Sequence, residues 1–374
     1  MKRFFTTLIM SIIIILLIAV LGILGYLVWQ EIDGEAVANI AQNFVSTVTS
    51  LGKDEENLST PGIIDTTSSE LEATPTSGDV NYDNVVVDNY FYDQLEEPSK
   101  IIYRALEANK ENMKSGTYQI NLGNTFTDIL SSANGESLLG DYYQSAVETF
   151  IYDNPDVFYL DVNKMYLNIE TTTKRNDVSY NVFINSGNQA NYLDEAYNSE
   201  AQINQAIAQL ESVRNQIIAQ AQGSAYNQIK YVHDYIVDNT SYDSTISNPD
   251  IYNIYGTLIR KSSVCEGYAK SFKYLMDALD IPCVIVIGEA TNSSGESESH
   301  AWNYVMLNNI WYAIDTTWDD PVVIGGGRPS SSAKTRYFLR GANTFNADHF
   351  PNGQFTQSGK TYEYPVLSQI DYSR

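Results

Sequence analysis

Cysteine and histidine are scarce in this chain: 374 residues include two cysteines and three histidines. The histidines are scattered, without the close pair that a zinc site needs, and no Gly-rich phosphate loop is present. Basic residues are also few, with 22 Lys and Arg against 46 Asp and Glu and a formal net charge of −24. Binding to nucleic acid is driven by Lys and Arg that neutralise phosphates. We therefore expect no nucleic-acid partner, no metal and no cofactor.

The N-terminus contains a long uncharged segment. Phe4–Trp29 follows Lys2 and Arg3 and exceeds the ~20 residues that span a bilayer as a helix. Basic residues before the segment and acidic residues after it predict a short cytoplasmic tail and an exported remainder. The small residues Ala36 and Ala38 leave cleavage of this segment as an alternative. We expect a single-pass membrane anchor.

Composition divides the remaining sequence into three parts. Residues 30–84 are rich in Ser, Thr, Gly and acidic residues and are predicted to be a disordered stalk. Residues 85–223 alternate helical and strand patterns and are predicted to be an accessory α+β region, followed by a catalytic domain over 224–374. Predicted helices cover 98–112, 141–153, 200–222 and 225–239, and predicted strands cover 157–160, 164–170 and 178–184.

The segment SSVCEGYAKSFKYLMDALDIPC, from Ser262, places Cys265 in the first turn of a predicted helix. An apolar stripe continues from Cys265 at helical spacing, and Ser263 with Glu266 matches a Ser-x-x-Glu capping box. The first helical turn has backbone N–H groups without partners and a positive dipole end, which favours the nucleophilic thiolate. Cys265 is therefore a candidate nucleophile.

Two plainer readings of Cys265 remain open at this point. A lone cysteine on an apolar helix stripe is commonly a buried packing residue. An exported chain with two cysteines also invites a disulfide, here with Cys283 in the strand-like run IPCVIVIG.

The segment HAWNYVMLNNIWYAID predicts a hairpin with Asn308 and Asn309 in its turn, because Asn tolerates positive φ. A turn centred on Asn308 and Asn309 pairs each residue of the first strand with a residue of the second, and the two numbers of every pair add up to 617. His300 is then the diagonal neighbour of Asp315 on one face, with backbones about 7–8 Å apart and side chains within reach. A one-residue shift of register would separate them.

A cysteine, a histidine and a carboxylate are the parts of a catalytic triad for acyl transfer. Here Cys265 is the candidate nucleophile, His300 the candidate base and Asp315 the candidate acid that orients the imidazole. His233 is on an apolar helix face and is interpreted as a structural hydrogen-bonding residue. His349 is the rival base, but the sequence shows no strand partner carrying an acid for it.

These motifs resemble the transglutaminase-like superfamily, in particular its exported bacterial members. The resemblance is carried by VCEGYAKSFKYLMDALDIPC and HAWNYVMLNNIWYAIDTTWDDP, with HDYIVDNTSYD upstream and RYFLRG and DHF downstream, over about residues 225–352. It implies an α+β fold with a papain-like, transglutaminase-like catalytic core, and it maps the family's triad onto Cys265, His300 and Asp315. Tyr252 or Tyr255 would replace the indole that helps to hold the oxyanion in animal members.

What the resemblance implies is a membrane-anchored extracellular thiol acyl transferase or hydrolase. It would act on amide bonds of proteins or wall peptides at the cell surface, through a cysteine thioester. The alternative is a catalytically silent surface binding or scaffold module on the same fold.

Overall fold

A computed structural model describes most of the chain after the predicted stalk. The residues described are 62–66, 81–174, 177–246, 248–292, 295–320, 330–352 and 361–373. Every element discussed below belongs to one compact unit, Leu58–Arg374. None of the helices in the described ranges has the length and apolar character needed to cross a membrane. The predicted anchor and most of the predicted stalk lie outside those ranges.

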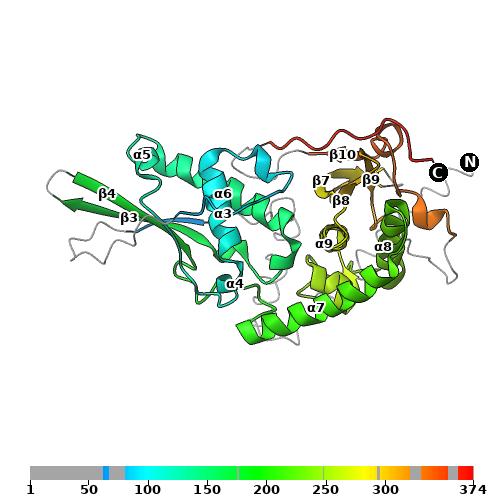
Figure 1. Ribbon diagram of the computed structural model, residues 1–374, viewed down its shortest axis with the longest axis horizontal. Coiled ribbons are helices and arrows are strands. Elements are labelled where there is room, and N and C mark those ends of the chain that lie inside the picture. The colour runs from blue at the N-terminus through cyan, green and yellow to red at the C-terminus, as the bar shows by residue number, and fades with distance from the viewer. Residues whose placement is uncertain are drawn as a thin grey trace, which may run out of the picture. The chain divides into compact units, whose positions relative to one another are not determined.

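A first, four-stranded sheet has the strand order β1-β3-β4-β2 (Figure 1). Strand β1 runs parallel to β3, whereas β4 is antiparallel to both β3 and β2. Helices α3 and α6 pack against each other beside this sheet. The strand bounds are β1 Gly62–Thr66, β2 Ile120–Gly123, β3 Tyr166–Lys174 and β4 Asp177–Asn185, and the helix bounds are α3 Glu97–Ala108, α4 Lys110–Met113, α5 Thr127–Leu130 and α6 Gly135–Asp153.

The helices and strands of residues 97–185 confirm the predicted mixture of helix and strand, with one exception. Helix α6 ends where the Asn154-Pro155 pair predicts. The predicted strand 157–160 is wrong: Pro155–Val157 forms a 3-10 turn, and Leu160 N–H donates to the Val157 carbonyl in a second turn. Proline fixes φ in the range of a helical turn, which outweighs the strand preference of the short apolar run after it.

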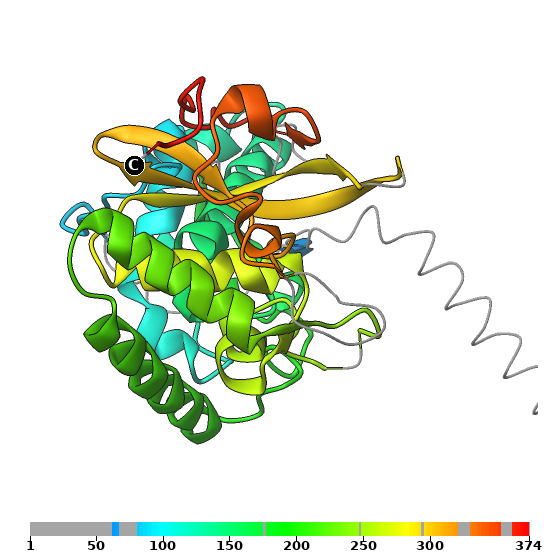
Figure 2. The same ribbon diagram turned by 90° about the vertical axis from the view of Figure 1, so that its right-hand side faces the viewer.

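A second sheet has the strand order β10-β7-β8-β9, with all neighbours antiparallel. Helix α9 packs on β7 and β8, and α8 packs on α9 (Figure 2). The bounds are α7 Glu200–Gln220, α8 Ala225–Asn239, α9 Cys265–Asp277, α10 Ala342–Phe345, β7 Cys283–Thr291, β8 Ser297–Leu307, β9 Ile310–Ile314 and β10 His349–Pro351. A separate short pair, β5 Ser241–Tyr242 and β6 Ser262–Ser263, is parallel.

The two long helices before α9 begin at serine caps. The Ser199 hydroxyl accepts a hydrogen bond from the Gln202 N–H at the start of α7, and Ser224 accepts one from the Asn227 N–H at the start of α8. Each cap satisfies a backbone donor that the helix itself leaves unpaired. Ile229, Val232 and Ile236 are then fully buried on one face of α8, as the helical spacing predicts.

A buried carboxyl group on α6 makes stability depend on pH. Glu148 is 1% exposed, and burial raises its pKa from 4.5 to about 8, with a smaller opposing effect of its hydrogen bond from Gln144. Between these two values the folded state holds a proton that the unfolded chain has released. The stabilising contribution is therefore complete below about pH 4.5 and is lost as the pH rises through about 8.

We predict that Glu148→Gln, which imitates the protonated acid, stabilises the protein relative to wild type by about 4 kcal/mol at pH 8 and by less than about 1 kcal/mol at pH 5. Urea unfolding at several pH values measures the difference. Glu136→Gln, on the exposed side of the same helix, is the control and should follow the wild-type curve. Parallel wild-type and Glu148→Gln curves would contradict the prediction.

Candidate active site

Cys265 is the first residue of α9, as predicted, and its side chain is partly exposed. The predicted capping box is wrong. Val264 is the N-cap, the Ser263 hydroxyl donates to the Ile251 carbonyl at 2.6 Å, and Glu266 pairs with Lys270 one turn later at 2.6 Å. Because no side chain caps this helix, the orphan N–H groups of its first turn remain beside the thiol.

The start of α9 is held by close backbone packing. The Val264 N–H also donates to the Ile251 carbonyl, at 3.1 Å. A Cβ on Gly267 would lie 2.0 Å from the Ser263 hydroxyl and 2.7 Å from the Ile251 carbonyl oxygen. Only glycine allows this approach, so the turn that presents Cys265 depends on residue 267 having no side chain.

The β8–β9 hairpin has the predicted register. Tyr304 pairs with Ala313 and Met306 pairs with Trp311, and Asn308 and Asn309 both have positive φ, at 53° and 65°. The diagonal contact that follows from this register is present: His300 Nε2 lies 2.8 Å from Asp315 Oδ2. A carboxylate can only accept hydrogen bonds, so His300 Nε2 donates to Asp315. The other ring nitrogen, Nδ1, is then the one available to interact with the Cys265 thiol.

Asp315 is fully buried, and its carboxylate accepts hydrogen bonds from two imidazoles and two backbone N–H groups. Its Oδ1 accepts from the backbone N–H groups of Thr317 and Trp318, at 2.9 and 3.1 Å. Burial alone would raise the pKa of Asp315, but the charge and hydrogen bonds of His300 and then His349 hold it well below the usual range. Asp315 is therefore a carboxylate at neutral pH.

His300 is 4% exposed, and its ring is stacked on Trp318 with centroids 5.1 Å apart. Burial would lower the pKa of His300, but Asp315 and then Cys265 outweigh burial and raise it from 6.5 to about 10. The structure thus brings Cys265, His300 and Asp315 together in the order thiol, imidazole, carboxylate, which can generate a thiolate beside an imidazolium.

His349 meets the same carboxylate, which the sequence did not indicate. It lies in β10 and is fully buried, with Nε2 3.2 Å from Asp315 Oδ2 and Nδ1 2.8 Å from Asp348 Oδ1. The ligand-type atoms of His300, Asp315 and His349 lie within 4.8 Å of one another, a spacing and donor set that could hold a metal ion. Both imidazole Nε2 atoms are directed at one carboxylate oxygen, so we assign the three as a hydrogen-bonded set rather than as metal ligands.

His233 has the structural role predicted for it. Both of its ring nitrogens face carboxylates, Nε2 towards Asp319 at 3.0 Å and Nδ1 towards Asp234 at 2.9 Å. Asp319 also accepts from the Tyr337 N–H at 2.9 Å, and its own N–H donates to the Asp315 carbonyl. His233 therefore anchors α8 to the turn that follows Asp315.

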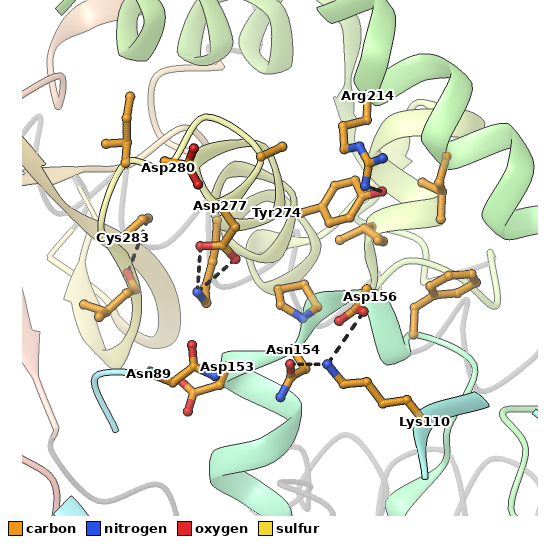
Figure 3. Close-up of a pocket in the computed structure, with 18 of the residues that line it drawn as sticks. Asn89, Lys110, Asp153, Asn154, Asp156, Arg214, Tyr274, Asp277, Asp280 and Cys283 are labelled. Atoms are coloured by element: carbon orange, nitrogen blue, oxygen red, sulfur yellow. Dashed lines mark hydrogen bonds and ion pairs between the residues drawn. The ribbon is translucent and has the colours of Figure 1, made fainter. Parts of the chain in front are cut away.

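Cys283 is a buried free thiol at the start of β7, so the alternative of a disulfide with Cys265 is wrong. It lines a cavity of about 900 Å³ at the C-terminal end of α9, the opposite end of that helix from Cys265 (Figure 3). Asp153 and the Lys273–Asp277 ion pair also line it, the pair at 3.0 Å. Burial, opposed by Lys273, raises the pKa of Asp153 to about 7.

The phenol of Tyr242 interacts electrostatically with Cys265, as does that of the buried Tyr152 on α6. The pairing of Tyr242 with Ser263 in the β5–β6 ladder places it beside the start of α9. Tyr242 is 43% exposed; its partial burial and then the Cys265 charge raise its pKa, so its hydroxyl is protonated at neutral pH. The Tyr255 hydroxyl, in contrast, donates to Gln209 at 2.6 Å.

The interaction between Cys265 and His300 can be tested on the histidine alone. We predict that Cys265→Ala lowers the pKa of His300 below its value of about 10, because the variant removes a negative charge while Asp315 keeps the pKa above 6.5. Imidazole nitrogen-15 shifts measured against pH report it, and three histidines make assignment simple. Cys283→Ala is the control. An unchanged His300 titration in Cys265→Ala would show that the two side chains do not interact.

Comparisons with known proteins found relatives and solved structures that are similar to part of this chain. Kyphoscoliosis peptidase of Mus musculus is 31% identical over 103 residues, a match that covers 24% of this chain and 15% of that protein. The Homo sapiens protein is 31% identical over 98 residues, with the same shares. A crystal structure of a TGase is 14% identical with a TM-score of 0.29, covering 47% of this chain and 50% of that one. The chain thus spans only 15% of the length of these curated relatives.

A family model matches the segment that holds the candidate site. Residues 211–316 match the family model described as the transglutaminase-like superfamily. This segment includes α8, α9, β7, β8 and β9, and therefore Cys265, His300 and Asp315. Residues 211–316 are therefore similar to the transglutaminase-like superfamily, and the described residues form a mixed α/β fold.

Proposed function

We propose that this protein is a thiol acyl transferase or hydrolase that acts on amide bonds of proteins or peptides through a thioester on Cys265. The observation that carries the proposal is the Cys265–His300–Asp315 arrangement, with His300 Nε2 2.8 Å from Asp315. The partly exposed thiol supports it as well, because a nucleophile must be reached by substrate.

The chemistry divides into two steps. The Cys265 thiolate attacks the carbonyl carbon of a carboxamide or peptide bond, and imidazolium His300 gives its proton to the nitrogen that leaves as an amine. An amine or water then attacks the thioester, with neutral His300 taking the proton of the attacking group, and releases the thiolate. Asp315 keeps the Nε2–H tautomer and stabilises the imidazolium.

Donors for the oxyanion come from two elements. The N–H groups of the first turn of α9, which contains Cys265 and has no side-chain cap, are the backbone donors, and we assign the Tyr242 hydroxyl as the side-chain donor. Tyr242 is preferred to the sequence-based candidate Tyr255 because the Tyr255 hydroxyl is bonded to Gln209, and to Tyr252 because Tyr242 interacts with Cys265.

The cellular setting belongs to the same proposal. The uncharged segment Phe4–Trp29 after Lys2 and Arg3 supports a membrane-anchored protein with its domain outside the cell. Surface proteins or wall peptides would then be the substrates. A catalytically silent binding module on the same fold is the alternative; the partly exposed thiol of Cys265 beside the His300–Asp315 pair favours the enzyme, because only an enzyme needs an activated nucleophile within reach of substrate.

Amine incorporation tests the proposal. The probes are dimethylated casein as acyl donor and monodansylcadaverine as amine, with products read by fluorescence and mass spectrometry. We predict turnover in wild type and in Cys283→Ser, and a loss of at least about 10³-fold in Cys265→Ser, which keeps the site's size but not its nucleophile.

The product identifies the second step. Dansyl-labelled casein would indicate a transferase, whereas a Glu in place of Gln or a cleaved chain would indicate a hydrolase. Equal signals from wild type and Cys265→Ser would contradict the enzyme reading and favour the silent module.

A further inference from the structure

His349 has no step in the proposed reaction, yet it is bonded on both sides to carboxylates near the thiol. Nε2 faces Asp315 Oδ2 at 3.2 Å, and Nδ1 faces Asp348 Oδ1 at 2.8 Å. Asp348 is itself bound by the Tyr337 hydroxyl at 2.8 Å. These contacts form a continuous path from Asp348 through His349, Asp315 and His300.

The ring of His349 is held by aromatic side chains on several sides. Phe345 stacks on it with centroids 4.0 Å apart and planes 26° apart, and Trp318 and Trp302 lie at 4.6 and 5.1 Å. Trp318 also stacks on His300. The His349 ring therefore has a fixed orientation, which sets the direction of its Nε2 towards Asp315.

One carboxylate oxygen serves two imidazoles. Asp315 Oδ2 meets the Nε2 atoms of both His300 and His349, while Oδ1 is occupied by two backbone N–H groups. Without His349, Asp315 would still be held by three donors and would keep its place. Its negative charge would then act more fully on His300, because a hydrogen bond to a carboxylate draws charge to the donor.

We propose that His349 is a positioning residue that acts through Asp315, competing with His300 for one carboxylate oxygen and so limiting how tightly His300 holds its proton. The role follows from the shared oxygen and the fixed ring. It rests on the proposed function, in which His300 must release a proton to a leaving amine. General acids work best when their proton affinity is close to that required at the working pH.

The charged and titratable groups around the two rings are few. Those facing His300 are Asp315, Cys265 and His349. Those facing His349 are Asp348, Asp315, His300 and the Tyr337 ring, with Arg336 3.9 Å from Asp348. Arg336 is largely exposed, so solvent screens its charge.

The competing explanation is that His349 only fills the aromatic cage. Two substitutions separate the explanations. His349→Phe keeps a planar ring for the cage but has no donor. His349→Gln loses the ring but carries an amide N–H close to the place of Nε2. His233→Phe is the matched control, since His233 is also buried between two carboxylates and against Phe338 but does not touch Asp315.

The experiment measures the titration midpoint of His300 by imidazole nitrogen-15 shifts. It is made in the Cys265→Ala protein, so that the result does not depend on any activity. We expect His349→Phe to raise the midpoint by about one pH unit, which is a tenfold change in proton affinity. His349→Gln should raise it less, and His233→Phe should leave it unchanged. A midpoint that stays or falls in His349→Phe would overturn the proposal.

A measurement without substitution covers the case in which His349→Phe does not fold. The nitrogen-15 shifts of wild type at pH 7 should show a proton on His349 Nε2, and an unprotonated Nε2 would overturn the proposal. In the Cys265-containing protein, His349→Phe should slow amine incorporation into casein about tenfold while iodoacetamide alkylation, which needs no proton donor, is not slowed. If no variant turns over casein but the midpoint rises, the proposed function fails and the coupling stands.

Discussion

The buried carboxylate of Asp315 is the interaction on which the site depends. Taking a carboxylate out of water is costly unless every lone pair is used, and here two imidazoles and two backbone N–H groups use them. The same bonds fix the His300 tautomer and leave its other nitrogen for Cys265. A requirement of folding and a requirement of the proposed acyl transfer are thus met by one group.

The turn after β9 connects several elements, because its three aspartates bind side chains from different helices and strands. Asp315 holds the histidines of β8 and β10, Asp319 holds His233 of α8, and Asp320 accepts from the Tyr268 hydroxyl of α9 at 2.7 Å. The helix that begins with Cys265 and the strand that carries His300 are therefore tied to a single short segment. Relative movement of the thiol and the imidazole is limited by these bonds.

Local signals predicted most of the site, and long-range contacts account for what they missed. Asn308 and Asn309 set the hairpin register, and this register alone is enough to predict that His300 lies beside Asp315. The sequence does not reveal the acid that His349 meets, because that acid is not on a neighbouring strand: β10 joins the sheet on the far side of β7, and His349 Nε2 lies 3.2 Å from Asp315. Tyr242 was missed for a similar reason, since a two-residue parallel pairing has no periodic pattern to detect. The false capping box shows that a local motif gives way when Ser263 finds a better-placed partner in the Ile251 carbonyl.

The most direct test of the account is the rate at which iodoacetamide alkylates each cysteine at neutral pH, in wild type and in Asp315→Asn. Mass spectrometry follows Cys265 and uses buried Cys283 as an internal reference. The account predicts that Cys265 reacts faster than Cys283 in wild type and slows by about tenfold or more in Asp315→Asn, where the imidazolium beside the thiolate loses its counter-charge. Equal Cys265 rates in the two proteins would contradict the claim that Asp315, through His300, activates this thiol.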